Sequence, residues 1–356
     1  MRPLTRQRQA GLSMIELMVA ITISLFLLVG LVSVFATSNQ TYMDLGRASQ
    51  QIENGRFATQ LLVDDISHAG FYGRYSQTPV LPGALPDPCI SVAASLSNAL
   101  ALPLQGYSSY PTPALTCLPA ANYLAGTDIL VVRRTDSTIT AGDTVTGTVI
   151  PNLTLTAGTI YMQSSADPTA LPIIAPGTGT KAGDEALFTL TSWSPTPPGA
   201  LAPIRRYHVH IYFVAPCSVP AGGGSVCTGS ADDNGSPIPT LKRLELTGNT
   251  WSLVPLVEGI ENLQIDYGID TDKDGVPDAT YVTAPALADW PNVVAVRINV
   301  LSRQIEPTNG YVDSKTYDMG VAAPAYTPPA PPALQYKRHV YNSVIRIVNP
   351  ASRRES

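Results

Sequence analysis

The chain has 356 residues, of which only 14% are charged, well below the roughly 25% of an ordinary soluble domain. Glycine and proline number 27 and 32, which favours frequent turns and short strands, and the hydrophobic fraction of 44% excludes disorder driven by charge repulsion. The net charge of −5, with no Lys/Arg cluster larger than a doublet, excludes a dedicated reader of duplex DNA, so no dedicated nucleic-acid site is predicted.

The amino terminus predicts a membrane-spanning helix. Its first eleven residues contain three arginines and no acid, and they precede an uncharged apolar run at residues 17–36. Such a run, at about 1.5 Å per residue, spans a hydrocarbon core roughly 30 Å thick, and it is too long for an ordinary secretory signal peptide. Because arginines stay on the cytoplasmic side, we expect a single pass through the inner membrane with the rest of the chain in the periplasm.

A glycine and an acid mark the start of this helix. The segment reads Gly11-Leu12-Ser-Met-Ile-Glu16, followed by the apolar run. It resembles the prepilin motif of type IV pilins and type II secretion pseudopilins, although those proteins usually have Phe where this chain has Leu12. The resemblance implies a leader at residues 1–11, cleavage between Gly11 and Leu12 by a prepilin peptidase, and N-methylation of the new amine of Leu12.

Glu16 is predicted to be an assembly carboxylate. An acid within a membrane helix costs about 2.5 to 3.5 kcal/mol, so it usually has a partner or a function. After cleavage the amine of Leu12 lies about one helical turn away, and Glu16 could pair with it or with the amine of a neighbouring subunit. The alternative is that Glu16 simply lies at the level of the lipid headgroups.

The helix is predicted to continue through residues 37–70 as an amphipathic segment. Apolar or small residues recur at intervals of three and four, and Gly70 is a plausible stop, so the helix would run for about 87 Å from residue 12 to residue 69. A coiled-coil dimer is less favoured, because Gly46 and Gly55 interrupt the pattern. The predicted apolar stripe is Leu45, Ala48, Ile52, Gly55, Ala58, Leu62, Ile66 and Ala69, and the polar residues predicted on other faces are Arg47, Gln51, Asn54, Asp65 and His68.

From residue 71 to residue 356 the pattern predicts a β-rich head. Apolar segments alternate with stretches rich in Gly, Pro, Asn and Asp, residues 74–125, 163–183 and 215–239 are loop-like, and residues 322–333 form a Pro-rich linker. The predicted fold class is therefore α+β, and with the prepilin motif it is type IV pilin-like. A long N-terminal helix, transmembrane at 12–36 and amphipathic at 37–70, is predicted to pack on a mainly antiparallel β head. The predicted strands are 127–133, 144–150, 186–192, 204–214, 240–247, 251–257, 261–268, 293–302 and 338–348.

Four cysteines and one acidic loop are the notable side chains of the head. An even number of cysteines in an exported chain predicts two disulfides, and of the three possible connectivities Cys89 with Cys117 and Cys217 with Cys227 closes the shortest loops. His208 and His210 share one face of a strand, where histidines satisfied by hydrogen bonds are commoner than a metal pair. No catalytic motif is present, so no catalytic residue and no enzyme activity are predicted.

The acidic loop runs from residue 270 to residue 278. It places acids at positions 1, 3, 5 and 9 and glycine at position 6, as in the first part of an EF-hand loop. Position 12, which should be Glu, is Tyr281. We expect a structural calcium ion, and the alternative is an acidic turn between two strands. The predicted ligands are Asp270, Asp272, Asp274, the carbonyl of Val276 and Asp278.

Several later segments add to the resemblance. Residues 48–58, 64–73, 257–270, 293–303 and 338–349 resemble minor pilins of the PilW type. The resemblance implies a minor pilin that initiates assembly of a type IV pilus and sits near its tip at the cell surface, with adhesion, twitching motility and, as an open question, DNA uptake as its roles. Implied partners are other minor pilins, the major pilin, a tip adhesin and the peptidase. The alternatives are a J-type pseudopilin of type II secretion and a membrane-tethered, calcium-dependent binding module that never polymerises.

Overall fold

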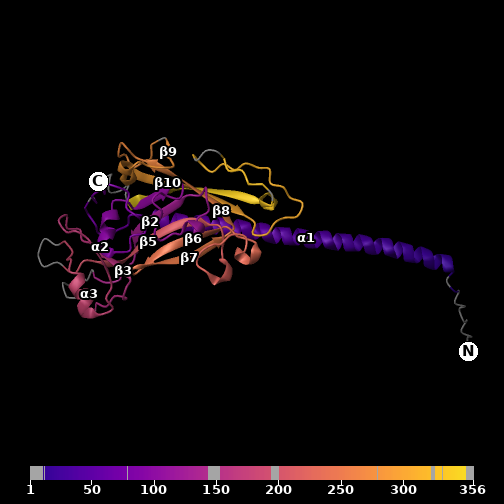
Figure 1. Cartoon of the computed structure of the whole chain (residues 1–356), viewed down its shortest axis with the longest axis horizontal. Coiled ribbons are helices and arrows are strands. Elements are labelled where there is room, and N and C mark those ends of the chain that lie inside the picture. Colours follow the sequence, from indigo (N-terminus) through magenta and orange to yellow (C-terminus); the bar gives the residue numbers. More distant parts are fainter. Residues whose placement is uncertain are drawn as a thin grey trace, which may run out of the picture. The chain divides into compact units, whose positions relative to one another are not determined.

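The computed structural model divides the chain into two compact units, residues 1–49 and 50–356, and each is described by itself (Figure 1). The long helix α1 (Met14–Ser67) begins in the first unit and ends in the second. The residues that the structure describes are 11, 13–77, 79–142, 153–193, 200–278, 280–321, 325–330 and 332–349.

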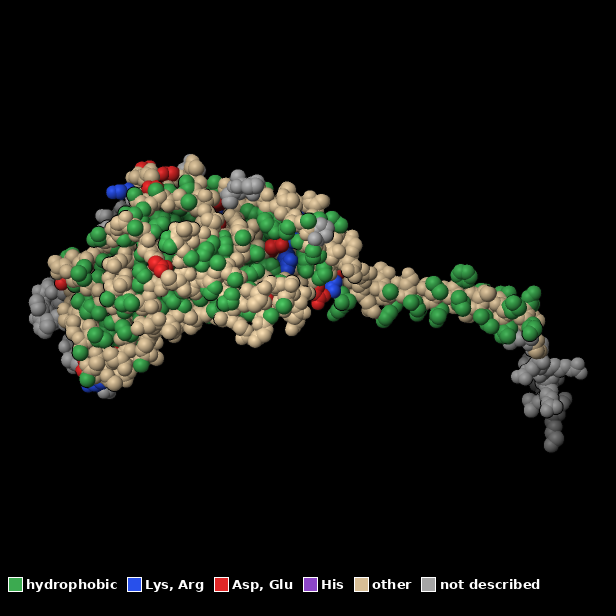
Figure 2. All heavy atoms as spheres, viewed as in Figure 1, with side chains coloured by type: hydrophobic (Ala, Val, Ile, Leu, Met, Phe, Trp, Pro, Cys, Tyr) green, Lys and Arg blue, Asp and Glu red, His purple; other side chains and the backbone are tan. Residues whose placement is uncertain are grey.

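The part of α1 in the first unit exposes apolar side chains all round. Between Met14 and Phe35 its leucines, isoleucines, valines and phenylalanines are at least half exposed, and Phe26 is 80% exposed. Figure 2 shows these hydrophobic side chains along the helix. It is the one described helix that is long and apolar enough to cross a membrane. A helix that is apolar on every side needs lipid or other helices around it.

The described residues of the head form two antiparallel sheets. The larger has seven strands in the order β1-β2-β5-β3-β4, with β6 paired to β5 and β7 paired to β6. The smaller has four strands in the order β11-β10-β8-β9. The larger sheet consists of β1 (Leu104–Tyr107), β2 (Ile129–Thr135), β3 (Ile160–Gln163), β4 (Ile173–Pro176), β5 (Ile204–Ala215), β6 (Thr240–Thr247) and β7 (Thr250–Glu258). The smaller consists of β8 (Ile260–Ile269), β9 (Tyr281–Val282), β10 (Val293–Arg303) and β11 (Arg338–Arg346).

The second half of α1 packs on both sheets. One core cluster joins Ala58, Leu62 and Ile66 of the helix to apolar residues of the larger sheet and of β8, β10 and β11. A second cluster fills the other face of the larger sheet beneath the segment that contains the short helix α2 (Ala93–Leu96). Burial of this apolar area is the main term that holds the head together. The predicted α+β class, with a long N-terminal helix and a mainly antiparallel head, is confirmed.

Most of the predicted strands are present, but two parts of the prediction are wrong and a third is not tested. The segment 186–192 is not a strand: residues 181–187 form helix α3 (Lys181–Leu187), because the Thr180 hydroxyl caps its first turn by accepting the Gly183 N–H. The loop-like regions 74–125 and 163–183 contain α2, β1 and β4. The predicted strand 144–150 lies outside the described residues.

The buried face of α1 differs from the predicted stripe at four positions. Gln51 and Asp65, which were expected on polar faces, are buried, whereas Leu45 and Ile52 are exposed. Gln51 donates from Nε2 to the Ser302 carbonyl of β10 at 3.1 Å. Gly55 is required for close packing rather than being an interruption, since a Cβ there would lie 2.1 Å from a ring carbon of Tyr341.

Asp128 links the two sheets where β2 begins. Its N–H donates to the Leu263 carbonyl of β8 at 2.8 Å, and its Oδ2 accepts the Ile265 N–H at 2.7 Å. Its other carboxylate oxygen, Oδ1, is buried with no hydrogen-bond partner among the described residues. Burial, and to a smaller extent the nearby Asp266 carboxylate, raise the pKa of the Asp128 carboxyl to about 7, although the hydrogen bond from Ile265 acts in the opposite direction.

We therefore expect Asp128→Asn to stabilise the head at pH 8 but not at pH 4. A carboxyl whose pKa is raised on folding imposes no penalty below its unfolded pKa, and the penalty grows as the pH rises toward its folded pKa. At about 1.4 kcal/mol per pKa unit, a shift from 3.8 to about 7 gives a gain in the free energy of unfolding at pH 8 of about 4 kcal/mol. Urea unfolding of both proteins at the two pH values measures this, and an equal difference at pH 4 and pH 8 would contradict it.

Candidate functional site

The amino-terminal motif forms a helix cap. Helix α1 begins at Met14, directly after Ser13. The Ser13 N–H donates to Glu16 Oε2 at 2.9 Å, and the Glu16 N–H donates to Ser13 Oγ at 3.2 Å. This reciprocal pair is a capping box, which satisfies two backbone donors that a helix otherwise leaves free. Gly11 is exposed, and Leu12 lies outside the described residues.

The cap sets where the helix begins relative to the predicted cleavage site and to Glu16. The helix begins two residues after the predicted cleavage site, so processing would leave a short chain end followed by a formed helix. Glu16 is exposed in the first turn, where a negative charge also interacts favourably with the helix dipole. Its carboxylate therefore already has one backbone partner and remains open to a cation.

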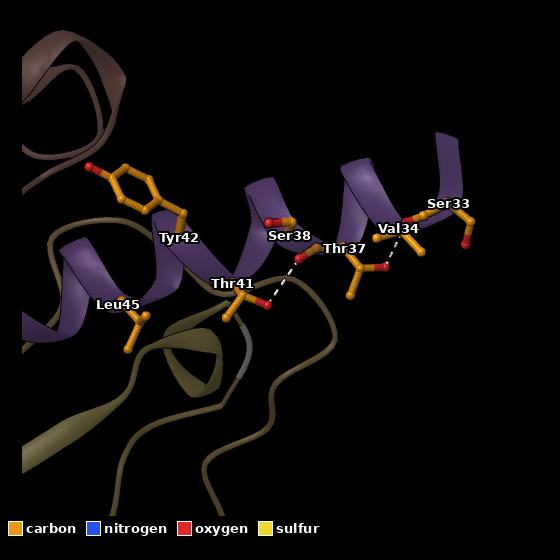
Figure 3. Close-up of a pocket in the computed structure, with 7 residues that line it drawn as sticks. All are labelled: Ser33, Val34, Thr37, Ser38, Thr41, Tyr42 and Leu45. Carbon is orange, nitrogen blue, oxygen red and sulfur yellow. Dashed lines mark hydrogen bonds between the residues drawn. The ribbon is translucent and has the colours of Figure 1, made fainter. Parts of the chain in front are cut away.

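A stripe of hydroxyl side chains follows further along the first unit. An open groove on this face is lined by Ser33, Val34, Thr37, Ser38, Thr41, Tyr42 and Leu45 (Figure 3). Thr37 Oγ1 donates to the Ser33 carbonyl and Thr41 Oγ1 to the Thr37 carbonyl, both at 2.9 Å. Small hydroxyl residues whose donors are satisfied within the helix allow neighbouring helices to approach closely. The sequence analysis missed this stripe, although its i, i+4 spacing is visible in the sequence.

Three of the five predicted calcium ligands lie together in the loop between β8 and β9. One oxygen each of Asp270, Asp272 and Asp274 lies within 4.8 Å of the others. Asp270 is buried and organises the loop, since its carboxylate accepts the Lys273 N–H at 2.7 Å and the Gly275 N–H at 3.1 Å. Lys273 and Gly275 have φ of 66° and 81°, which turn the chain back on itself. Three carboxylates at this spacing suit a hard cation.

The remaining predicted ligands have other contacts. The Val276 N–H donates to Asp274 Oδ1 at 2.8 Å. Asp278 accepts the Thr271 hydroxyl at 2.7 Å, and it is not part of the three-carboxylate group. At the position where an EF-hand supplies Glu, the ring of Tyr281 lies 4.3 Å from the guanidinium carbon of Arg297. That position therefore contributes packing and a cation–π contact instead of a carboxylate.

Both disulfides form with the predicted connectivity. Cys89 bonds Cys117 with a Cα separation of 5.4 Å, and Cys217 bonds Cys227 with a Cα separation of 5.9 Å. Asp232 lies near the second bridge but does not make it a metal site, because both sulfurs are already bonded. Burial raises the pKa of Asp232, but hydrogen bonds from its own loop outweigh burial and lower that pKa to about 2.

A buried ionic cluster ties α1 to the larger sheet, and it was not predicted. Asp65 of the helix accepts hydrogen bonds from Arg134 Nε at 2.6 Å, His210 Nδ1 at 2.7 Å and the Tyr212 hydroxyl at 2.9 Å. Burial alone would raise the pKa of Asp65, but His210 and Arg134 outweigh burial and hold it below its ordinary value. The sequence signal that could have predicted the burial of Asp65 is its position seven residues after Ala58, which places both residues on the same helix face.

The two strand histidines are satisfied by carboxylates, as expected for structural histidines. His210 contacts Asp65, and His208 Nε2 lies 2.8 Å from Asp136 Oδ1. Burial, together with the neighbouring His210, lowers the pKa of His208 to about 4, so His208 is neutral at pH 7. Neither histidine belongs to a group of possible metal ligands within the described part of the chain.

Comparison with known proteins gives two family matches. Residues 6–32 match the prokaryotic N-terminal methylation motif, and residues 227–349 match the type IV pilus-assembly protein W family, PilW. No curated protein matches the chain. Among solved structures, the chain is similar to a type IV-like pilin from Thermus thermophilus, with 14% identity over 41% of this chain and 79% of that chain and a TM-score of 0.20.

The two matched regions coincide with the two features built above. The first contains Gly11, Ser13 and Glu16 together with the exposed apolar helix. The second runs from Cys227 to Asn349 and contains β6 to β11, with the whole smaller sheet and the Asp270 loop. The two matches support the resemblance to PilW-type minor pilins of type IV pili that the sequence shows, the first through the amino-terminal motif and the second through residues 227–349 of the head.

Proposed function

We propose that this protein initiates assembly of a type IV pilus and sits near its tip. The observation that carries the proposal is the exposed apolar helix that begins at Met14, is capped by Ser13 and carries Glu16 in its first turn. The methylation motif across this segment and the PilW region in the head support it. The protein would be the substrate of a prepilin peptidase and not itself an enzyme.

The geometry suggests how the protein would pass from membrane to filament. Before assembly, lipid would cover the apolar residues that α1 exposes, with the disulfide-bonded head in the periplasm, where such bonds persist. The helix could leave the lipid only where other apolar helices replace it. Neighbouring pilins would supply them: other minor pilins, the major pilin and the pilins that hold a tip adhesin. The hydroxyl stripe from Ser33 to Thr41 offers one face for such packing.

The test is the mature amino terminus. We expect mass spectrometry of the protein isolated from cells to find N-methylated Leu12 as the first residue. A deletion strain should lose retractable surface pili and twitching motility. Loss of protein secretion with intact pili would instead identify a type II secretion pseudopilin, and retention of residues 1–11 would identify a tethered binding module that never assembles.

We also propose that the Asp270 loop binds calcium with a structural role. In support, the three carboxylates converge within 4.8 Å, and the chain between them is already folded into a turn. The ion would hold β8 and β9 at their junction. The low ligand count, without a carboxylate at position 12, suggests an affinity of about 10⁻⁴ to 10⁻³ M, as in extracellular modules.

Asp272→Ala is the variant that tests calcium binding. Asp272 is exposed, and its carboxylate accepts a long hydrogen bond of 3.3 Å from the Asp274 N–H, so its loss should leave the ion-free head intact. We expect calcium titration calorimetry on the detergent-solubilised protein to show at least about tenfold weaker binding. Asp64→Ala, which removes an exposed acid from α1, is the charge-matched control. If the unaltered protein binds no calcium at millimolar concentration, the site does not exist.

A further inference from the structure

Arg133 carries a buried positive charge that no carboxylate of the described residues neutralises. The residue lies in β2 and is 1% exposed. Its Nη1 donates to the Leu102 carbonyl at 2.9 Å and its Nη2 donates to Gln105 Oε1 at 2.8 Å, and both acceptors are neutral. The next residue along the strand, Arg134, pairs instead with Asp65 at 2.6 Å. Because a guanidinium keeps its proton in proteins, the charge of Arg133 remains inside the core.

Elsewhere in the head a buried arginine has carboxylates as counter-ions. Arg338 pairs with Glu261 and Asp313. Without such partners, the desolvation cost of a buried charge exceeds what neutral hydrogen bonds offset. Around Arg133 the ionisable neighbours are tyrosines. Burial raises the pKa of Tyr207 well above its ordinary value, so its phenol stays neutral. The described residues near Arg133 therefore supply no negative charge.

The hydroxyl of Tyr207 is a buried donor on the same face of the sheet. Strands β2 and β5 pair Arg133 with Val209 and Thr135 with Tyr207, so Arg133 and Tyr207 are diagonal neighbours. Long side chains at diagonal positions of an antiparallel pair reach one another. Tyr207 is 2% exposed, and its hydroxyl has no hydrogen-bond partner within the described part of the chain. A charged donor and a neutral donor thus lie side by side, and what they lack is an acceptor.

A small anion fits these two donors better than a water molecule or a protein carboxylate. A water molecule would accept from the Tyr207 hydroxyl but would bring two protons of its own, and the two acceptors next to Arg133 already bind the guanidinium. A carboxylate of another chain cannot reach a side chain that is buried in the core. We propose that Arg133 and Tyr207 bind a small inorganic anion such as chloride, which accepts a hydrogen bond from each and neutralises the guanidinium. This proposal does not depend on the proposed pilus function.

The position of the site connects it to the end of the long helix. Helix α1 ends at Ser67. The Gly70 N–H donates to the Arg133 carbonyl at 2.9 Å, and the Thr135 N–H donates to the Phe71 carbonyl at 2.8 Å. The chain that leaves α1 therefore bonds to β2 at the residue that would hold the anion. Bound chloride would stabilise the head where the helix joins the larger sheet.

The chloride dependence of thermal unfolding tests the site. The detergent-solubilised full chain is compared in sodium chloride and in sodium gluconate at the same ionic strength, since gluconate is too large to enter a closed core. With a dissociation constant of about 1 mM, about 100 mM chloride should raise the melting temperature by about 5 °C. An equal melting temperature in the two salts would overturn the proposal.

Tyr207→Phe separates specific binding from a general effect of the salt. It keeps the ring and removes the hydroxyl donor, so the chloride-dependent rise in melting temperature should fall to about half. Arg133→Met removes the charge and should abolish the rise. The control is Tyr161→Phe, which removes a hydroxyl of the neighbouring strand β3 that accepts the Thr156 N–H, and it should keep the full rise. A full rise in Tyr207→Phe, or an equal loss in Tyr161→Phe, would overturn the proposal even if Arg133→Met fails to fold.

Discussion

Glu16→Ala is expected to remove the protein from assembled filaments while leaving membrane insertion and leader cleavage unchanged. An uncompensated carboxylate in apolar surroundings costs about 2.5 to 3.5 kcal/mol, which the positive amine of Leu12, in the same or a neighbouring subunit, would offset. Without the carboxylate, that amine is left unpaired among packed helices. The corresponding loss of incorporation is about a hundredfold.

The capping box allows the role of the charge to be separated from the role of the cap. Glu16 accepts the Ser13 N–H, so alanine removes a helix cap as well as a negative charge. Glutamine keeps an oxygen that can accept the same N–H, and it removes only the charge. If Glu16 pairs with an amine, Glu16→Gln should fail to assemble as Glu16→Ala does. If Glu16 serves only to start the helix, Glu16→Gln should assemble normally.

The measurement is the fraction of each variant in the sheared filament fraction, by quantitative immunoblot. Mass spectrometry of the cell-associated protein provides the control, because both variants should still lack residues 1–11. Normal incorporation of Glu16→Ala would contradict the assembly role. A variant that keeps its leader would show that Glu16 acts at the peptidase step instead.

The elements that could be predicted from sequence are those with local signals. The helix over residues 14–67 follows from apolar spacing and the glycine after it, and β5, β8 and β10 follow from long apolar runs between turn residues. Strand β3 has four residues, and it exists because it pairs with β5 more than forty residues later, which no local pattern reports. The strand predicted at 186–192 is wrong at its start because its first two residues belong to α3, whose first turn is capped by Thr180.

The residues of the candidate site also divide into those with a local sequence signal and those whose role depends on distant parts of the chain. Gly11, Glu16 and the Asp270 loop are contiguous patterns, and the cysteine pairs follow from the shortest loops. The Asp65 cluster joins residues 145 positions apart, and the proposed anion site depends on the pairing of β2 with β5. Burial of Gln51 and Asp65 could not be read from their polarity, because their partners are a carbonyl of β10 and side chains of β2 and β5. Whether such polar side chains are buried depends on partners that are distant in the sequence.

Arg338 anchors the segment between β10 and β11 through a fully buried ionic network. Its guanidinium forms a bidentate pair with Glu261 and a bond from Nη1 to Asp313 Oδ2 at 3.0 Å. It also donates to the carbonyls of Ala333 and Tyr336 at 2.8 and 2.9 Å, which fixes the approach to β11. The side chains of Arg338 and Asp313 are completely buried.

Arg338→Met is expected to lower the free energy of unfolding by about 3 to 5 kcal/mol at pH 7. The variant leaves two carboxylates buried without their cation, and removal of one partner of a buried pair costs about this much. Urea unfolding of both detergent-solubilised proteins at pH 7 gives the comparison.

The triple variant Arg338→Met, Glu261→Gln, Asp313→Asn separates charge from packing. It removes the stranded charges along with the cation, and replacement of a whole buried network often costs little. We expect it to recover most of the stability that Arg338→Met loses. If the triple variant is as unstable as the single one, the contribution of Arg338 comes from its contacts with the Ala333 and Tyr336 carbonyls instead, and the start of β11 depends on those two bonds.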